Sequence, residues 1–192
     1  MPEIMYVIVV VLAVAGGLVL LPLVWFIVTY NGLIAGRNRV KDAWSGIDVD
    51  LKRRYDLIPN LVETVKGYAK HERELLERVT EARAACLSAS GPAESAQAEN
   101  FLTQTLKSLF AVAENYPDLK ANQNFLQLQG ELAGTENRVA GARKGYNGEV
   151  RRYNTRLQSV PANIVAGICG FKAEEFFETG EAAAREPVKV KF

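Results

Sequence analysis

The chain has 192 residues, with 23 Lys or Arg against 22 Asp or Glu, and its formal net charge is +1. This near balance excludes the strong basic field with which proteins attract nucleic acid, so we expect no nucleic-acid partner. Two cysteines and a single histidine leave little material for a disulfide framework or for imidazole chemistry.

A charge-free run opens the chain. No charged residue occurs between Glu3 and Arg37, and the stretch Ile4–Val28 is almost wholly apolar. Its 25 residues, at a rise of ~1.5 Å each, form a helix of roughly 37 Å, which exceeds the 30 Å or so of a bilayer's hydrocarbon core. Aromatic residues near both ends suit the membrane interfaces, and a proline should bend the helix modestly. We therefore predict a transmembrane anchor within residues 1–30, with spanning residues Ile4, Tyr6, Pro22, Trp25, Phe26 and Val28.

The residues that flank this stretch predict whether it is cleaved and in which direction it crosses the membrane. A cleaved secretory signal is the alternative, but no basic residue precedes the cleavage-like Ala13-Val14-Ala15, and the apolar run continues beyond it. Basic residues follow the span and are absent before it, which favours an N-terminus outside and the remainder in the cytoplasm. The same residues are candidate contacts to lipid headgroups: Arg37, Arg39 and Lys41.

A three–four spacing of mostly apolar residues continues after the span, at Tyr30, Leu33, Arg37, Val40, Trp44, Ile47, Leu51, Arg54 and Ile58. This spacing is typical of one helical face. No proline occurs between Leu23 and Ile58, so we predict that the membrane helix continues into the next domain as one rod. The stretch Asp56–Asn60, which contains Pro59, predicts the first break, a tight helical hairpin.

Three further helices are predicted from the same three–four spacing of apolar residues. They are expected over Leu61–Cys86, Phe101–Ala113 and Phe125–Val160, with breaks at Ser88–Pro92, Tyr116–Asp118 and Pro161. The predicted fold is all-α, with an N-terminal transmembrane helix that is continuous with an antiparallel four-helix bundle. The bundle occupies residues 31–162, and an apolar C-terminal segment and tail occupy residues 163–192.

The last bundle helix has two unusual features. It contains five glycines, which either allow close approach to a neighbour or mark a poorly stabilised surface helix: Gly130, Gly134, Gly141, Gly145 and Gly148. The pair Tyr146-Asn147 recurs seven residues later as Tyr153-Asn154. Core tyrosines with polar groups at the rim are the simpler interpretation, and a ligand site is the other.

The segment after Pro161 is apolar, rich in small residues and ends in an aromatic pair. It either packs on the bundle near the membrane, or inserts into the interface or docks a partner. The residues of this possible interaction segment are Ile164, Ile168, Phe171, Phe176 and Phe177.

Two arginines, Arg37 and Arg54, occupy positions on the apolar face. A buried arginine needs a carboxylate partner, because an unpaired buried charge costs several kcal/mol. The candidate partners are Glu72, Glu131 and Glu136. We hypothesise a polar layer that fixes the register of the helices; the alternative is that both arginines extend to the edge of the bundle.

Several stretches resemble the LemA family. The most specific is Leu57–Glu72, and others are Tyr116–Ala121, Thr135–Val139 and the two Tyr-Asn pairs. The resemblance covers essentially the whole chain. It implies a bacterial inner-membrane protein with one N-terminal span, an antiparallel helical bundle and no established enzymatic activity. A relative in magnetosome membranes implies membrane organisation rather than chemistry.

No motif indicates a reaction. Metal-ligand spacings, a phosphate loop, a dinucleotide fingerprint and a nucleophile elbow are all missing from the sequence, so we expect no catalytic residue, metal or cofactor. We predict a membrane-anchored scaffold or adaptor that binds an unidentified protein partner or associates with itself. The alternative is a membrane-shaping or membrane-organising oligomer that contacts lipid through its C-terminal segment.

Overall fold

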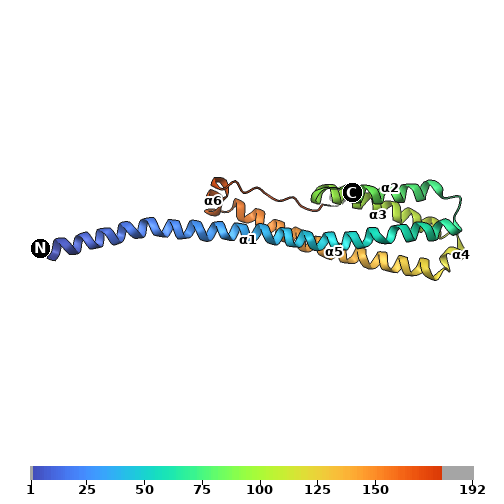
Figure 1. The fold of residues 1–192 in the computed structure, drawn as a ribbon, viewed down its shortest axis with the longest axis horizontal. Coiled ribbons are helices and arrows are strands. Elements are labelled where there is room, and N and C mark those ends of the chain that lie inside the picture. Colours follow the sequence, from blue (N-terminus) through green and yellow to red (C-terminus); the bar gives the residue numbers. More distant parts are fainter. Residues whose placement is uncertain (1, 179–192) are drawn as a thin grey trace, which may run out of the picture. The chain divides into compact units, whose positions relative to one another are not determined.

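The computed structural model describes residues 2–178, and its regular structure within that range is helical, without strands. The helices are α1 (Pro2–Tyr68), α2 (Arg73–Ser88), α3 (Gly91–Ala113), α4 (Pro117–Lys120), α5 (Gln123–Gln158) and α6 (Ala162–Ile168), as Figure 1 shows. The all-α class is confirmed for these residues. The tail from residue 179 onward lies outside the described residues.

Helix α1 is uninterrupted from Pro2 to Tyr68, which confirms the predicted continuity between the apolar stretch and the following helical region. Its most apolar 18-residue window has a mean hydropathy of 3.0, and none of that window is buried. Among residues 2–178, this is the one helix long and apolar enough to cross a membrane.

The predicted hairpin at Asp56–Asn60 is wrong, because α1 continues through Pro59. Proline has no N–H to donate to the carbonyl four residues earlier, which belongs to Tyr55. That carbonyl instead accepts a hydrogen bond of 2.8 Å from Nε of Arg83 on α2. Ile58 and Leu61, on either side of the proline, are fully buried. Packing and a donor from another helix thus offset the cost of the proline.

The first reversal of the chain therefore lies between α1 and α2, at residues 69–72. Helix α3 begins earlier than predicted, at Gly91 rather than at Phe101. Gly91 has a φ of +81°, which glycine adopts without strain. Pro92 stands in the first turn of α3, where its missing N–H costs little.

The glycines of α5 do not interrupt that helix, and no other helix of this chain lies within 4 Å of where their Cβ atoms would stand. Close approach occurs instead on α1. A Cβ at Gly36 would lie 3.2 Å from the ring of Tyr153, and one at Gly32 would meet the guanidinium of Arg156. Two glycines spaced by four residues thus let α5 approach α1 closely.

The chain divides into two compact units, one of residues 1–41 and 151–174, the other of residues 42–150 and 175–192. In the first unit, Leu33 packs with Val165 and Ala166 of α6. In the second, α2 and α3 lie side by side (Figure 1). The part of α1 in the second unit contributes Ile47, Ile58 and Leu61 to the buried core.

Candidate functional sites: a buried ionic cluster, an open groove and a clamped segment

An arginine and a glutamate form an ion pair inside the second unit. Arg54 of α1 and Glu99 of α3 are each only 3% exposed, and Nη1 of Arg54 donates to Oε2 of Glu99 over 3.2 Å. The other terminal nitrogen donates to Oγ1 of Thr103 over 3.1 Å and lies 3.9 Å from Oε2 of Glu136. Glu99 therefore compensates a charge whose burial alone would cost several kcal/mol.

Two further polar side chains surround the carboxylate of Glu99. The Cys86 thiol donates to Oε1 of Glu99 over 3.7 Å, and the Tyr55 hydroxyl lies beside both groups. Burial raises the pKa of Glu99 despite the opposing attraction of Arg54. Burial also raises the pKa of Tyr55 and raises that of Cys86 to about 12, and the Glu99 charge adds to both effects. The thiol therefore stays protonated at neutral pH and is a poor nucleophile.

The other residues of the predicted polar layer lie elsewhere. Glu72 accepts a 2.9 Å hydrogen bond from the Tyr116 hydroxyl, and Glu131 accepts one of 2.9 Å from Gln127 on its own helix. Arg37 stands over the ring of Phe171, with its guanidinium carbon 5.5 Å from the ring centroid. Of the proposed partners, the structure places Glu136 beside Arg54.

The sequence analysis missed Glu99, the closest partner of Arg54. A signal for it exists, because Glu99 falls on the same three–four spacing as the buried Leu102, Leu106 and Leu109 of α3. The expected start of that helix at Phe101 left Glu99 outside it.

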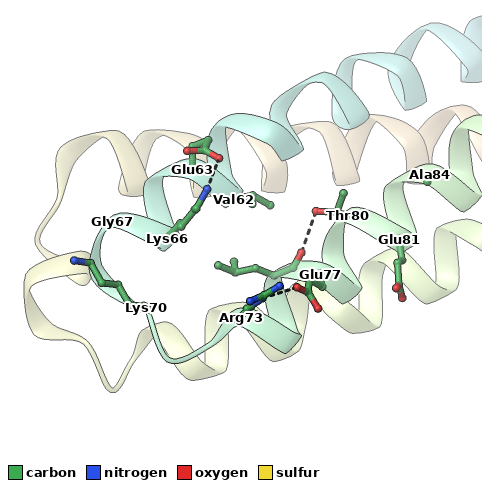
Figure 2. Close-up of a pocket in the computed structure, with 12 residues that line it drawn as sticks. Val62, Glu63, Lys66, Gly67, Lys70, Arg73, Glu77, Thr80, Glu81 and Ala84 are labelled. Atoms are coloured by element: carbon green, nitrogen blue, oxygen red, sulfur yellow. Dashed lines mark hydrogen bonds and ion pairs between the residues drawn. The ribbon is translucent and has the colours of Figure 1, made fainter.

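An open groove of about 1060 Å³ separates the C-terminal part of α1 from α2 (Figure 2). Small and apolar side chains, among them Val62 and Leu76, line it. Charged side chains of both signs stand around it: Glu63, Lys66, Lys70, Arg73, Glu77 and Glu81. Two pairs among them, Lys66–Glu63 at 3.4 Å and Arg73–Glu77 at 2.7 Å, lie within single helices. A groove lined by apolar side chains and by charges of both signs suits an amphipathic helix.

Two asparagines of α5 hold the extended segment that follows α6. The side chain of Asn154 donates to the Glu174 carbonyl over 2.8 Å and accepts from its N–H over 2.9 Å. Asn147 makes the same pair of bonds with Phe177, at 3.0 and 2.9 Å. The repeat interval explains the match, since seven helical residues rise about 10.5 Å and three extended residues span about 10 Å. We call these contacts the asparagine clamps.

The tyrosines of the same repeat are buried, at 2% exposure each. The Tyr146 hydroxyl donates to the Glu175 carbonyl over 2.7 Å, and the Tyr146 ring packs against Trp44 at a centroid distance of 5.6 Å. The repeat therefore positions backbone of this chain. Within residues 2–178, no group of three or more His, Cys, Asp or Glu side chains is arranged to hold a metal ion.

The predicted interaction segment divides into buried and exposed members. Phe177 is 1% exposed and packs on Trp44, while Phe171 is half-buried against Tyr30 at a centroid distance of 5.6 Å. Phe176 is half-buried. Ile164 and Ile168 of α6 are 54% and 71% exposed.

The predicted spanning and headgroup residues all lie on α1. Most of the former are exposed, whereas Phe26 is half-buried and packs against the cluster of Leu33, Val165 and Ala166. Arg39 and Lys41 are exposed, and Arg37 is half-buried.

A family model described as the LemA family matches residues 43–192. This chain belongs to the LemA family. Magnetosome protein MamQ 2 of Paramagnetospirillum magneticum is 26% identical over 175 residues, which cover 78% of this chain and 64% of the relative. Protein LemA of Metamycoplasma hominis is 26% identical over 140 residues, covering 71% and 63%. Magnetosome protein MamQ of Magnetospirillum gryphiswaldense is 25% identical over 187 residues, covering 82% and 69%. The chain thus spans less than two thirds of the length of the first two of these relatives.

Proposed function

We propose that this LemA-family chain is a membrane-anchored helical scaffold that presents its second unit to a protein partner at the bacterial inner membrane. The observation that carries the proposal is the continuity of α1, which leads from an apolar stretch, whose most apolar window is unburied, to the buried positions Ile47 and Leu51 without a loop. A protein that holds a partner near a bilayer gains from such a connection, because no flexible stalk disperses the bound partner. The proposal includes no catalytic step.

The proposed topology has α1 crossing the membrane once, with its N-terminal end outside and the rest of the chain in the cytoplasm. The basic residues after the span, Arg37, Arg39 and Lys41, support this orientation. Membrane-impermeant thiol labelling of Ser90→Cys and Pro2→Cys in intact cells tests it, in each case with Cys169 replaced by serine. We expect labelling at position 2 alone, and labelling at position 90 would reverse the orientation.

In the proposed architecture, the second unit is an antiparallel four-helix bundle of the C-terminal part of α1 with α2, α3 and α5. Two contacts support opposite directions for α1 and α5: Asp50 pairs with Arg138 at 3.3 Å, and Arg54 lies 3.9 Å from Glu136. As the residue number rises along α1, that of its partner on α5 falls. The Arg54–Glu99 pair fixes the register of α1 against α3, since a shift would leave both charges buried and unpaired.

The groove beside α2 is the proposed docking surface, and the proposed partner is an amphipathic helix carrying charges of both signs. Its apolar face would cover the half-buried Val62, and its charges would meet the charged side chains that line the groove. A photo-crosslinking amino acid at Ala84, in the groove, should trap a discrete partner in native membranes. The same probe at Val49, which is 69% exposed outside the groove lining, is the control. Equal trapping at both positions, or none at Ala84, argues against the groove.

A second candidate function is a self-associating protein that organises the membrane. The magnetosome proteins among the relatives favour it. If it is correct, the full chain reconstituted at rising protein-to-lipid ratios will reshape vesicles and form homo-oligomers. Unchanged vesicles together with a monomer in detergent would favour the scaffold.

A further inference from the structure

Helix α6 packs against the end of the apolar stretch of α1. Its residues Val165 and Ala166 are buried against Leu33, and Phe26, Leu157 and Phe171 pack against the same cluster. Phe26 lies within the charge-free stretch that ends at Val28. Anything that surrounds the last turns of that stretch therefore also reaches α6.

With α1 spanning a bilayer as proposed, this contact would fall in the headgroup layer. A stretch of roughly 37 Å exceeds the ~30 Å hydrocarbon core, so its last residues emerge from the core unless the helix tilts strongly. Leu33 follows Val28 by five residues, or about 7.5 Å along the helix. That distance is close to the thickness of the interfacial layer on one side, about 5–7 Å.

The outer side of α6 is apolar. Ile164 and Ile168 are 54% and 71% exposed, and a spacing of four residues places them on one side of the helix, away from Val165 and Ala166. Val160, just before α6, is 80% exposed. Residues 157–171 contain no charged side chain. A helix with apolar residues on both its packed side and its outer side is normally covered by protein or by lipid, and here the outer isoleucines are exposed.

Basic residues bracket this apolar segment. Arg156 precedes it and Lys172 follows it. Seven Lys or Arg residues against two Asp or Glu residues give residues 1–41 and 151–174 a net charge of +5, whereas the whole chain carries +1. Positive charge is therefore concentrated in the unit that contains the apolar stretch, where anionic headgroups would attract it.

We propose that α6 lies in the lipid–water interface of an anionic membrane, with Ile164 and Ile168 in the boundary of the acyl chains and the flanking basic residues among the headgroups. The inference rests on the proposed membrane span of α1. It adds a second membrane contact, made by a part of the chain more than 120 residues beyond the span.

The chain carries a natural reporter for this test. Cys169 is exposed and adjoins Ile168, whereas Cys86 is buried and its pKa is raised to about 12 by burial. A thiol-reactive, environment-sensitive dye such as an NBD derivative will therefore label Cys169 selectively near pH 7.5. The labelled full chain is reconstituted in vesicles of phosphatidylethanolamine and phosphatidylglycerol, with and without lipids that carry a nitroxide quencher high on the acyl chain.

We expect a blue-shifted emission, strong quenching by the shallow nitroxide lipid and weak quenching by aqueous iodide. The double variant Ile164→Asp/Ile168→Asp should lose the nitroxide quenching and gain iodide quenching. The matched control Val49→Asp replaces a residue of similar exposure, 69%, and should leave both unchanged.

Iodide quenching equal to that of the dye on glutathione would overturn the inference. A second result would also overturn it: protection of the dye from iodide that rises with the protein-to-lipid ratio, without quenching by the nitroxide lipid. A second copy of the chain would then cover α6. Alkaline carbonate extraction separates these results from a failure of the anchor. Chain released by carbonate contradicts the proposed function itself, whereas retained chain with a water-exposed Cys169 contradicts the placement of α6 alone.

Discussion

Replacing Arg83 by methionine removes a side chain that compensates for Pro59 within α1. The Nε of Arg83 donates to the Tyr55 carbonyl over 2.8 Å, and the proline leaves that carbonyl without its intrahelical donor. Hydrogen bonds to charged groups contribute about 1.5–3 kcal/mol, and the half-buried position of Arg83 favours the lower part of that range. We expect the free energy of unfolding to fall by about 1.5–2 kcal/mol, and the melting temperature by about 5 °C.

The assay is a double-mutant cycle on the full chain in detergent, in which circular dichroism monitors thermal and urea unfolding. Pro59→Ala restores the backbone N–H, so in that background Arg83→Met should cost less than about 0.5 kcal/mol, a coupling of about 1–1.5 kcal/mol. Arg78→Met, an exposed arginine on the same helix, is the control and should change little. An equal cost of Arg83→Met in both backgrounds would refute the reasoning, because the arginine would then act independently of the proline.

Three further substitutions test the sites described above. Arg54→Met should lower the free energy of unfolding by about 3–5 kcal/mol at pH 7.5. Burial already raises the pKa of Glu99, and the substitution removes the opposing attraction of Arg54. Glu99 in the folded variant therefore takes up a proton on acidification, and the loss of unfolding free energy shrinks toward pH 5. An equal loss at both pH values would contradict this reasoning. Gly141→Ala, in open space on α5, should raise the free energy of unfolding by about 0.5–1 kcal/mol. Gly36→Ala should lower it, because the added Cβ would press against the ring of Tyr153. The opposite order of melting temperatures would count against the packing described. Asn154→Ala should speed amide exchange in the segment that it clamps, as measured by hydrogen–deuterium exchange and mass spectrometry, and unchanged protection would show that other contacts hold the segment.

Periodicity predicted those parts of the fold that depend on one helix at a time. The spacing of apolar residues along α1 correctly marked Leu33, Val40 and Ile47 as buried, because a helical face is a local property of the sequence. The absence of proline between Leu23 and Ile58 likewise predicted that the apolar stretch and the next region form one helix.

The errors arose where a distant residue changes a local preference. Proline at position 59 ordinarily ends or kinks a helix, and its compensating donor, Arg83, comes from 24 residues further along the chain. Glu99 was missed because a loop-like composition around Gly91 hid the first ten residues of α3. The Tyr-Asn repeat was recognised, but its target is an extended segment that lies 20–30 residues away from the asparagines in sequence.

The asparagine clamps also bear on how this chain can diverge. Both amides recognise only main-chain N–H and C=O groups, which every residue except proline possesses. The exposed side chains of Ala173 and Glu175 can therefore change over evolutionary time while the backbone keeps its path. Asn147 and Asn154, together with the Tyr146 hydroxyl, specify this path through main-chain contacts, so the exposed side chains along it can vary in chemistry while the path stays the same.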